Sequence, residues 1–243
     1  MLAAFNLTKT FGNRTVLRGL SLSIAPGEIV SLIGVNGAGK TTLLRILSYL
    51  TRADLGQVQF NNIGTQSDPI AYRRQIGVVL HAPMIYSNLT ARENLRFFSR
   101  LYQLPQVEER IDELLVLVNL RSRADDLVRT YSRGMQQRLS IARALLHDPA
   151  CLLLDEPYTG LDQDSAEVFE SLIQQASSVG KMVLLATHDL EKACRAGTRI
   201  DLLHQGRIAL SQPRSDLTPE GLAQLYREVT GAQPVKHAEG DAA

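Results

Sequence analysis

The sequence predicts an α/β protein, because strand-like and helix-like segments alternate along most of the chain. Its 243 residues are enough for one large domain or two small ones. Hydrophobic residues make up 44% and charged residues 21%, which is typical of a globular protein that builds its core without metal or disulfide support. The strand pattern is interrupted in the middle third of the chain, where the residues follow a helical period.

The expected strands are short apolar segments that end in turns or polar residues. Residues 16–24 alternate apolar and polar side chains, and Pro26-Gly27 closes them with a turn. A helix is expected over residues 41–50, whereas the polar residues 61–69 indicate a loop. The other expected strands are residues 29–33, 77–80, 151–154, 182–186 and 200–203.

The helical pattern of residues 91–120, divided by Pro105, defines the expected domain organisation. No linker rich in Gly, Ser or Pro brackets this stretch, so we predict a helical subdomain at about residues 88–150, inserted in a single domain that spans residues 1–231. The remaining residues, 232–243, are small and polar and are expected to form a flexible tail.

Charge and cysteine content restrict the class of protein only slightly. The net charge of +1 argues neither for nor against nucleic acid as a partner. Cys151 and Cys194 have no CxxC spacing, which favours a reducing compartment over a disulfide framework. We expect no signal peptide at residues 1–7 and no membrane span, because no apolar run approaches ~20 residues. Association with a membrane would therefore require a partner.

The strongest motif is a Gly-rich loop between an expected strand and an expected helix. Glycines allow backbone N–H groups to surround a phosphate chain, and the following helix directs its positive end at the anion. Lys40 supplies a charge for the outer phosphates, and the Thr41 hydroxyl is suited to ligate Mg²⁺. The loop matches the pattern G-x-x-x-x-G-K-[ST] and reads Gly34-Val35-Asn36-Gly37-Ala38-Gly39-Lys40-Thr41, followed by Thr42.

Two carboxylates, Asp155 and Glu156, follow the apolar residues 151–154. Ligands of α/β sheets bind at the carboxyl ends of strands. Asp155 is suited to hold Mg²⁺, and Glu156 to orient or deprotonate an attacking water. A solvated turn after a strand has the same composition, but the combination with the phosphate loop favours catalysis.

Four further segments occur in a fixed order around these motifs. They are Phe11, Ser132-Arg133-Gly134-Met135-Gln136, Gly160-Leu161-Asp162 and Thr187-His188-Asp189. They resemble, in that order, the adenine-stacking aromatic, the signature motif, the D-loop and the switch histidine of ABC transporter ATPases. The signature departs from the usual Leu-Ser-Gly-Gly-Gln at Tyr131 and Arg133. The resemblance covers roughly residues 2–210.

The resemblance implies a P-loop NTPase core with the helical subdomain inserted in its middle and an antiparallel β subdomain at its N-terminal side. It also implies that two copies bind two molecules of ATP between them, with the signature of one copy on the γ-phosphate held by the other. ATP and Mg²⁺ are then the expected cofactors. The predicted ATP contacts are Phe11, Gly34, Asn36, Gly37, Ala38, Gly39, Lys40, Thr41, Thr42, Ser132, Gly134, Gln136 and Asp162, and the predicted catalytic residues are Lys40, Glu156 and His188.

Several of these residues have an ordinary structural alternative. Ser132 and Asp162 are common helix N-caps, His188 could simply end a strand, and Phe11 could fill a core. The ATP-binding interpretation depends on their joint occurrence.

His81 stands where ABC ATPases carry a Gln that ligates Mg²⁺ and contacts the transmembrane partner. Imidazole lacks the carbonyl oxygen that Mg²⁺ prefers, so Thr41 and Asp155 are the firmer predicted metal ligands and His81 is a doubtful one. His81-Ala82-Pro83 and residues 88–97, 132–138 and 155–162 resemble, more narrowly, the haem exporter ATPase of cytochrome c maturation (CcmA type).

The resemblance therefore predicts a peripheral subunit at the cytoplasmic face of the cell membrane, which hydrolyses ATP to power export through separate transmembrane subunits. The alternative is a soluble ABC-type ATPase that acts on nucleic acid or ribosomes. One phosphate loop, no sustained heptads and no basic tail favour the transporter. Arg92, Arg96 and Arg100 share one face of an expected helix, either as a solvated stripe or as a contact with a membrane partner.

Overall fold

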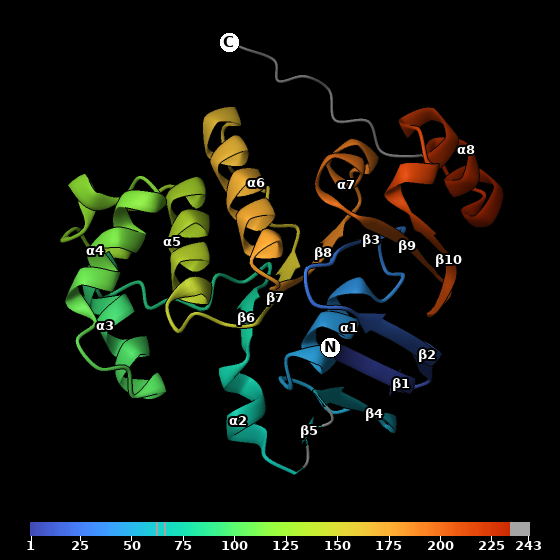
Figure 1. Ribbon diagram of the computed structural model, residues 1–243, viewed down its shortest axis with the longest axis horizontal. Coiled ribbons are helices and arrows are strands. Elements are labelled where there is room, and N and C mark those ends of the chain that lie inside the picture. The colour runs from blue at the N-terminus through green and yellow to red at the C-terminus, as the bar shows by residue number, and fades with distance from the viewer. Residues whose placement is uncertain (62, 66, 234–243) are drawn as a thin grey trace.

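The computed structural model describes residues 1–61, 63–65 and 67–233, and its larger sheet has six strands in the order β10-β9-β3-β8-β7-β6 (Figure 1). Every neighbouring pair is parallel except β9 and β10. The strands are β3 (Ile29–Ile33), β6 (Ile76–Val79), β7 (Cys151–Asp155), β8 (Met182–Thr187), β9 (Arg199–His204) and β10 (Arg207–Pro213). The predicted α/β class is confirmed.

A second sheet at the N-terminal side has the order β2-β1-β4-β5, and all its pairings are antiparallel. Its strands are β1 (Leu2–Phe11), β2 (Arg14–Ile24), β4 (Leu55–Phe60) and β5 (Ile63–Gly64). This sheet is the antiparallel β subdomain that the family resemblance implies. Sequence periodicity alone identified only β2 among its strands.

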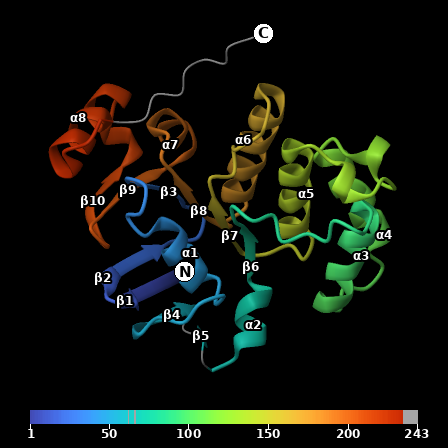
Figure 2. The same ribbon diagram turned by 180° about the vertical axis from the view of Figure 1, so that it is seen from behind.

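Three helices, α3 (Ala91–Tyr102), α4 (Glu108–Leu117) and α5 (Arg133–Leu145), lie between β6 and β7 in the chain and on one side of the molecule (Figures 1 and 2). They form the predicted helical insertion, together with the short turns η1 (Arg121–Arg123) and η2 (Val128–Thr130). The basic stripe of α3 is largely paired inside this unit. Arg92 binds Asp112 at 2.7 Å, and Arg96 binds Glu108 at 2.7 Å, so these arginines join α3 to α4.

The other helices surround the larger sheet. They are α1 (Lys40–Leu47), α2 (Pro69–Arg74), α6 (Gln163–Ser178), α7 (Leu190–Ala196) and α8 (Pro219–Thr230), with the turn η3 (Arg214–Asp216) before α8. Among the residues described, no helix combines the length and the apolar character that crossing a bilayer requires.

Side chains alternate between two cores on opposite faces of the larger sheet. On β7, Leu152 and Leu154 join the core built with α3 to α6, whereas Cys151 and Leu153 join the core under α1 and the smaller sheet. Because both faces are covered, β7 is buried throughout and emerges at its carboxyl end as the two acids.

Two local expectations are wrong. Helix α1 ends at Leu47 rather than at residue 50, because Tyr49 turns to a left-handed φ of 57°. The N–H of Leu50 then bonds to Arg45 O at 2.9 Å, in a Schellman-type helix end. The expected loop at residues 61–69 contains β5 and ends where Pro69 begins α2. Most of the expected tail, from residue 234 on, lies outside the described residues.

Candidate active site

The phosphate loop connects the buried strand β3 to the first residue of α1, Lys40. Gly39 has a φ of 114°, and a Cβ placed there would lie 2.9 Å from Leu17 Cδ2. Only glycine fits this position, because the smaller sheet packs directly against the loop. The backbone is thereby fixed around the start of the helix, where N–H groups and the helix dipole favour an anion.

The loop borders an open hollow of about 690 Å³. The larger sheet places the carboxyl ends of β3 and β7 at the same edge, with β8 between them. The phosphate loop and the two acids therefore meet across more than a hundred residues of sequence. The hollow is lined by Arg14, Val16, Asn36, Gly37, Gly39, Lys40, Thr41, Thr42, Asp155 and Glu156.

The Lys40 ammonium faces this hollow from a buried side chain. It donates to Gly34 O at 2.6 Å and to Val35 O at 3.4 Å. Burial lowers the pKa of Lys40, while the nearby charges of Glu156 and Asp155 act in the opposite direction. A cation held at the loop by backbone carbonyls can exchange those partners for phosphate oxygens with little rearrangement.

Asp155 and Thr41 are paired at the rim of the loop. The Thr41 hydroxyl donates to Asp155 Oδ2 at 2.7 Å. Burial raises the pKa of Asp155, and the hydrogen bond from Thr41 partly offsets that rise. A hydroxyl and a carboxylate at this separation, beside a phosphate loop, are the hard oxygen ligands that fit Mg²⁺.

Glu156 is oriented by residues at the end of the neighbouring strand β8. Its carboxylate accepts a hydrogen bond from the Thr187 hydroxyl at 3.1 Å, and its Oε1 lies 2.6 Å from His188 Nδ1. Its backbone has a left-handed φ of 49°, and its N–H donates to Ala186 O. Such a conformation in a residue other than glycine is uncommon and often marks a functional site.

The signature residues lie at the start of α5. The Ser132 hydroxyl caps this helix by accepting from Met135 N at 3.2 Å, and Gln136 Nε2 donates to Tyr131 O. A Cβ at Gly134 would lie 2.2 Å from Gly160 O, so the signature packs directly on the D-loop of the same chain.

Asp162 caps α6 by accepting from Ser165 N at 2.9 Å, so the ordinary N-cap role holds for both Asp162 and Ser132. Neither residue lines the hollow at the phosphate loop. Gln136, in contrast, lines a second hollow of about 740 Å³ together with His81, Asp155 and Glu156.

Phe11 and Arg14 face each other across the hairpin of β1 and β2. The Phe11 ring is 52% exposed, and the Lys9 ammonium lies 5.3 Å from its centroid, so Phe11 is not core filler. Phe11 lies outside the lining of the hollow, whereas Arg14 is part of it. Sequence reasoning missed Arg14. The available signal was a basic residue three positions after the expected stacking aromatic.

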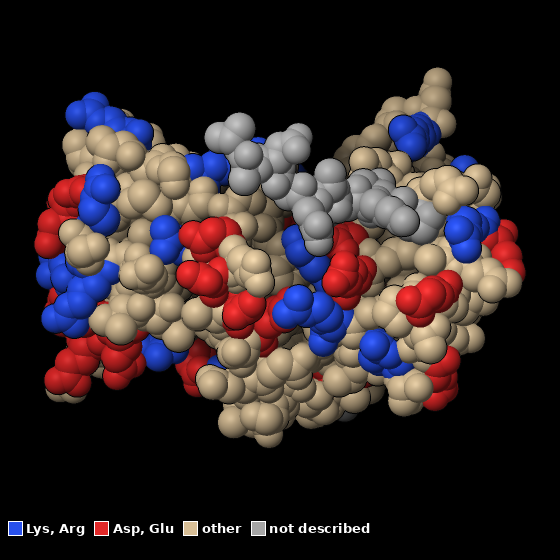
Figure 3. Space-filling model, turned by 90° about the horizontal axis from the view of Figure 1, so that it is seen from above, with Lys and Arg blue, Asp and Glu red and all other residues tan. Residues whose placement is uncertain are grey.

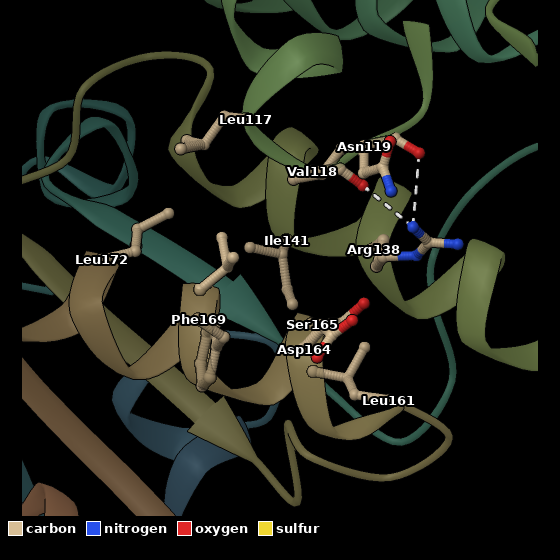
Figure 4. A pocket seen from close by; sticks show the side chains of 11 residues that line it. Leu117, Val118, Asn119, Arg138, Ile141, Leu161, Asp164, Ser165, Phe169 and Leu172 are labelled. Carbon is tan, nitrogen blue, oxygen red and sulfur yellow. Dashed lines mark hydrogen bonds between the residues drawn. The ribbon is translucent and has the colours of Figure 1, made fainter. Parts of the chain in front are cut away.

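A separate apolar pocket lies between α4, α5 and α6 (Figure 4). Arg138 lies at its edge and donates to Val118 O and Asn119 O, which caps the end of α4. The pocket contains no residue of the phosphate loop, and its lining is mostly aliphatic, as Leu117, Ile141 and other side chains in Figure 4 show. It is not a nucleotide site.

Gly134→Ala is expected to lower the free energy of unfolding by about 1–3 kcal/mol, because the added methyl has no room beside Gly160 O. Thermal unfolding of the variant measures the loss. Gly221→Ala is the matched control, since a Cβ there meets only the Thr218 hydroxyl at 3.2 Å. Equal melting temperatures for the two variants would contradict the close packing of signature and D-loop.

Comparisons with known proteins agree with this geometry. The ABC transporter family model matches residues 17–159. The ABC transporter ATP-binding protein NatA of Bacillus subtilis is 36% identical over 195 residues, which are 79% of either chain. The Nod factor export ATP-binding protein I of Rhizobium meliloti is 35% identical over 232 residues, or 94% of this chain and 69% of the relative.

Solved structures show the same similarity. The ATP binding subunit of an ABC transporter superimposes with a TM-score of 0.87 at 30% identity, over 94% of this chain and 99% of that one. The ATP-binding cassette MJ0796, in a dimeric post-hydrolysis state bound to ADP and Pi, gives a TM-score of 0.80 at 32% identity, over 88% and 99%. The chain described here belongs to the ABC transporter family of ATP-binding proteins and is an ABC-type ATPase.

Proposed function

We propose that this ATPase works as one half of a dimer that powers export through separate transmembrane subunits. The observation that carries the proposal is the convergence of Lys40, Asp155 and Glu156 on one hollow, while the exposed Ser132 and the half-buried Gly134 lie outside its lining. A complete site then needs the signature of a second copy, and the dimeric state of MJ0796 supports that arrangement.

The roles follow from the contacts of each residue. The loop amides and Lys40 bind and orient the phosphates, while the Glu156 carboxylate takes the proton of the attacking water. His188 and Thr187 keep that carboxylate in place. Thr41 and Asp155 would hold Mg²⁺, which neutralises phosphate charge when bound. The exposed Phe11 ring is available to stack on adenine.

The signature serves the opposite site in this proposal. The first turn of α5 presents N–H groups at Gly134 and its neighbours, and no acidic residue lies in that turn. Its Ser132 hydroxyl and the helix dipole suit the γ-phosphate of ATP bound by the other copy. Asp162 stands at the start of α6 beside the same region and connects the two sites.

An apolar surface supports a membrane subunit as the partner. Met84, Tyr86, Phe97 and Leu101 are exposed around α3 and the loop after β6, and Leu101 is 63% exposed. The centroids of the Tyr86 and Phe97 rings are 4.8 Å apart, so a residue of the loop after β6 and a residue of α3 contribute to one patch. Exposed clusters of large apolar side chains mark protein interaction sites.

The test is affinity purification of the chain from mild-detergent extracts, followed by mass spectrometry. Membrane-spanning subunits in stoichiometric yield are the expected result, and Leu101→Asp is expected to lose them while its own ATPase activity persists. Val179→Asp is the matched control, because Val179 is 73% exposed at the end of α6. Recovery of ribosomes or nucleic-acid proteins, with no membrane protein, would overturn the transporter function and favour the soluble ATPase.

The charges on one face of the molecule give no support to a nucleic-acid partner. Lys and Arg are interspersed with Asp and Glu on the face seen in Figure 3, rather than gathered in one basic tract. Binding to the phosphate backbone of nucleic acid depends on such tracts.

The proposal also includes the location and the domain bounds of the chain. The chain lies at the cytoplasmic face of the membrane as a peripheral subunit, and residues 1–231 form a single domain.

The cargo is the narrowest part of the proposal. Haem export for cytochrome c assembly rests on the short segments at residues 81–83, 88–97, 132–138 and 155–162. The names of the relatives state other roles, Nod factor export and, for LnrL of Bacillus subtilis at 33% identity over 89% of this chain and 70% of the relative, linearmycin resistance. A haem-handling protein of cytochrome c assembly among the purified membrane subunits would support haem, and its absence would leave export of another cargo.

Arg14→Ala is expected to weaken ATP binding by about 5- to 20-fold, because its guanidinium lines the hollow beside Gly37. Titration calorimetry with the variant measures the change. Arg18→Ala, on the same strand but outside that lining, is the control. Equal affinities for both variants would remove Arg14 from the site.

A further inference from the structure

Helix α5 is tied to β6 and to the loop after it by side chains from one helix face. The Ser140 hydroxyl donates to Pro83 O at 3.0 Å, and Arg143 Nη2 donates to Val78 O at 2.5 Å. Both donors are buried, with Ser140 at 0% and Arg143 at 6% exposure. The strand and its loop are therefore bound to α5 at two successive places, on either side of His81.

The contact between α5 and β6 is also close along the backbone. A Cβ at Gly77 would lie 2.4 Å from Ala144 O, so no side chain separates strand and helix. One turn further, His147 Nε2 lies 3.2 Å from Ile76 O, and the Tyr102 ring stacks on the imidazole with centroids 3.9 Å apart. The whole length of β6 moves with α5 if this contact is kept.

Burial of the Arg143 guanidinium at this position is unfavourable in free energy. It forms no ion pair among the described residues, and its Nε is buried without a hydrogen-bond partner in that part of the chain. Its guanidinium carbon lies 5.3 Å from the Phe98 centroid, and burial lowers the pKa of Arg143. An apolar side chain of similar volume would fill this space at lower cost in free energy.

We propose that Arg143 is a positioning residue that fixes the His81 loop (residues 80–86) to the helix that carries the signature. The inference rests on the proposed function. In the proposed dimer, the first turn of α5 contacts the ATP bound by the partner copy, whereas His81 borders Asp155 and Glu156 of its own copy. At ~1.5 Å per residue, about 16 Å of rigid helix separate Ser132 from Arg143. Displacement of the anion-binding end is thereby transmitted to the loop that borders Asp155 and Glu156.

Amide hydrogen exchange of the nucleotide-free protein tests the positioning directly. Arg143→Met is expected to raise exchange over residues 76–86 by about tenfold or more, because the segment loses the hydrogen bond to Val78 O in its middle and keeps only the contacts of Ser140 and His147 near its ends. Arg110→Met is the matched control, since the half-buried Arg110 donates to Leu145 O at 3.3 Å and this bond does not reach β6. Equal exchange in this segment for both variants would overturn the proposal.

Turnover separates positioning from simple packing. Arg143→Met is expected to lower kcat for ATP by about tenfold with KM changed less than about twofold, since misplacement of catalytic groups affects the reaction more than binding. Arg143→Lys, which keeps one donor for Val78 O, recovers part of the rate. A lower melting temperature with full kcat per folded molecule would mean a packing role only.

A third variant covers failure of Arg143→Met to fold. Ser140→Ala removes the hydrogen bond to Pro83 O alone, and is expected to raise exchange over residues 82–86 but not over residues 76–79. No rise there would contradict the positioning. The exchange measurements need no ATPase activity, so a wild-type chain that fails to hydrolyse ATP would refute the proposed function and leave this inference to its own test.

Discussion

Glu156→Gln is expected to lower ATP turnover by about 10²- to 10⁴-fold, the usual contribution of a general base. Glutamine keeps the shape of the side chain and an oxygen that can accept from the Thr187 hydroxyl, which lies 3.1 Å from the native carboxylate. It cannot take a proton from water. The phosphate loop is untouched, so ATP affinity should remain within a few fold of the wild type.

The same change is expected to accumulate an ATP-bound dimer, because in the proposed dimer hydrolysis is the step that releases the two copies. Light scattering during size-exclusion chromatography, with and without ATP, measures the dimer. Glu167→Gln is the matched control, since Glu167 is exposed on α6 and accepts a hydrogen bond from Gln163 at 3.2 Å, away from the phosphate loop. A Glu156→Gln variant that stays monomeric at saturating ATP would contradict the sandwich arrangement.

The parts of the site that could be predicted are the ones encoded in contiguous residues. Strand β3 occurs at residues 29–33 as expected, and the glycines that follow it predict a tight loop. Strand β7 was equally predictable, because four apolar residues followed by Asp155 and Glu156 fit a buried strand that carries acids at its carboxyl end. The sheet then brings these two segments together by its topology alone.

The parts that could not be predicted depend on contacts between distant segments. Arg14 joins the hollow because the smaller sheet packs on the phosphate loop, and nothing within β2 announces that packing. The spacing of Arg92 and Arg96 predicted a basic stripe on one helix face, whereas the structure pairs both side chains with acids on α4. Arg143 looked like one more helix-forming residue, since its carbonyl partner lies 65 residues earlier in the chain.

The shortfall in the N-terminal sheet has a different cause. Strand β1 has irregular register, with shifts at three places against β2, so its side chains do not keep a strict period of two. In the larger sheet, the edge strand β10 alternates only between exposed and partly covered residues, and none of its side chains is buried. Periodicity is a weak signal for strands of either kind.

Lys40→Ala is expected to weaken binding of ATP by about 10- to 100-fold, the range for losing a charge-assisted hydrogen bond. The lost charge faces the hollow, and two carbonyls, Gly34 O and Val35 O, would turn to water instead. The loss of the Lys40 hydrogen bonds to these carbonyls costs little free energy, because the open hollow lets water replace the ammonium. The melting temperature without nucleotide should therefore change less than the stabilisation that ATP gives to the wild type.

Comparison of nucleotides locates the effect of Lys40 on the phosphate chain. Because its ammonium is placed for the outer phosphates, the loss of affinity should be greatest for ATP and ADP and small for AMP. Lys181→Ala provides the control, since Lys181 pairs with Asp148 at the surface, far along the chain from the loop. Unchanged ATP affinity in Lys40→Ala would refute the assignment of the loop, whereas an equal loss for all three nucleotides would place Lys40 near the nucleoside instead. Titration calorimetry with each nucleotide distinguishes these outcomes, because the three ligands differ only in the phosphates that Lys40 is proposed to bind.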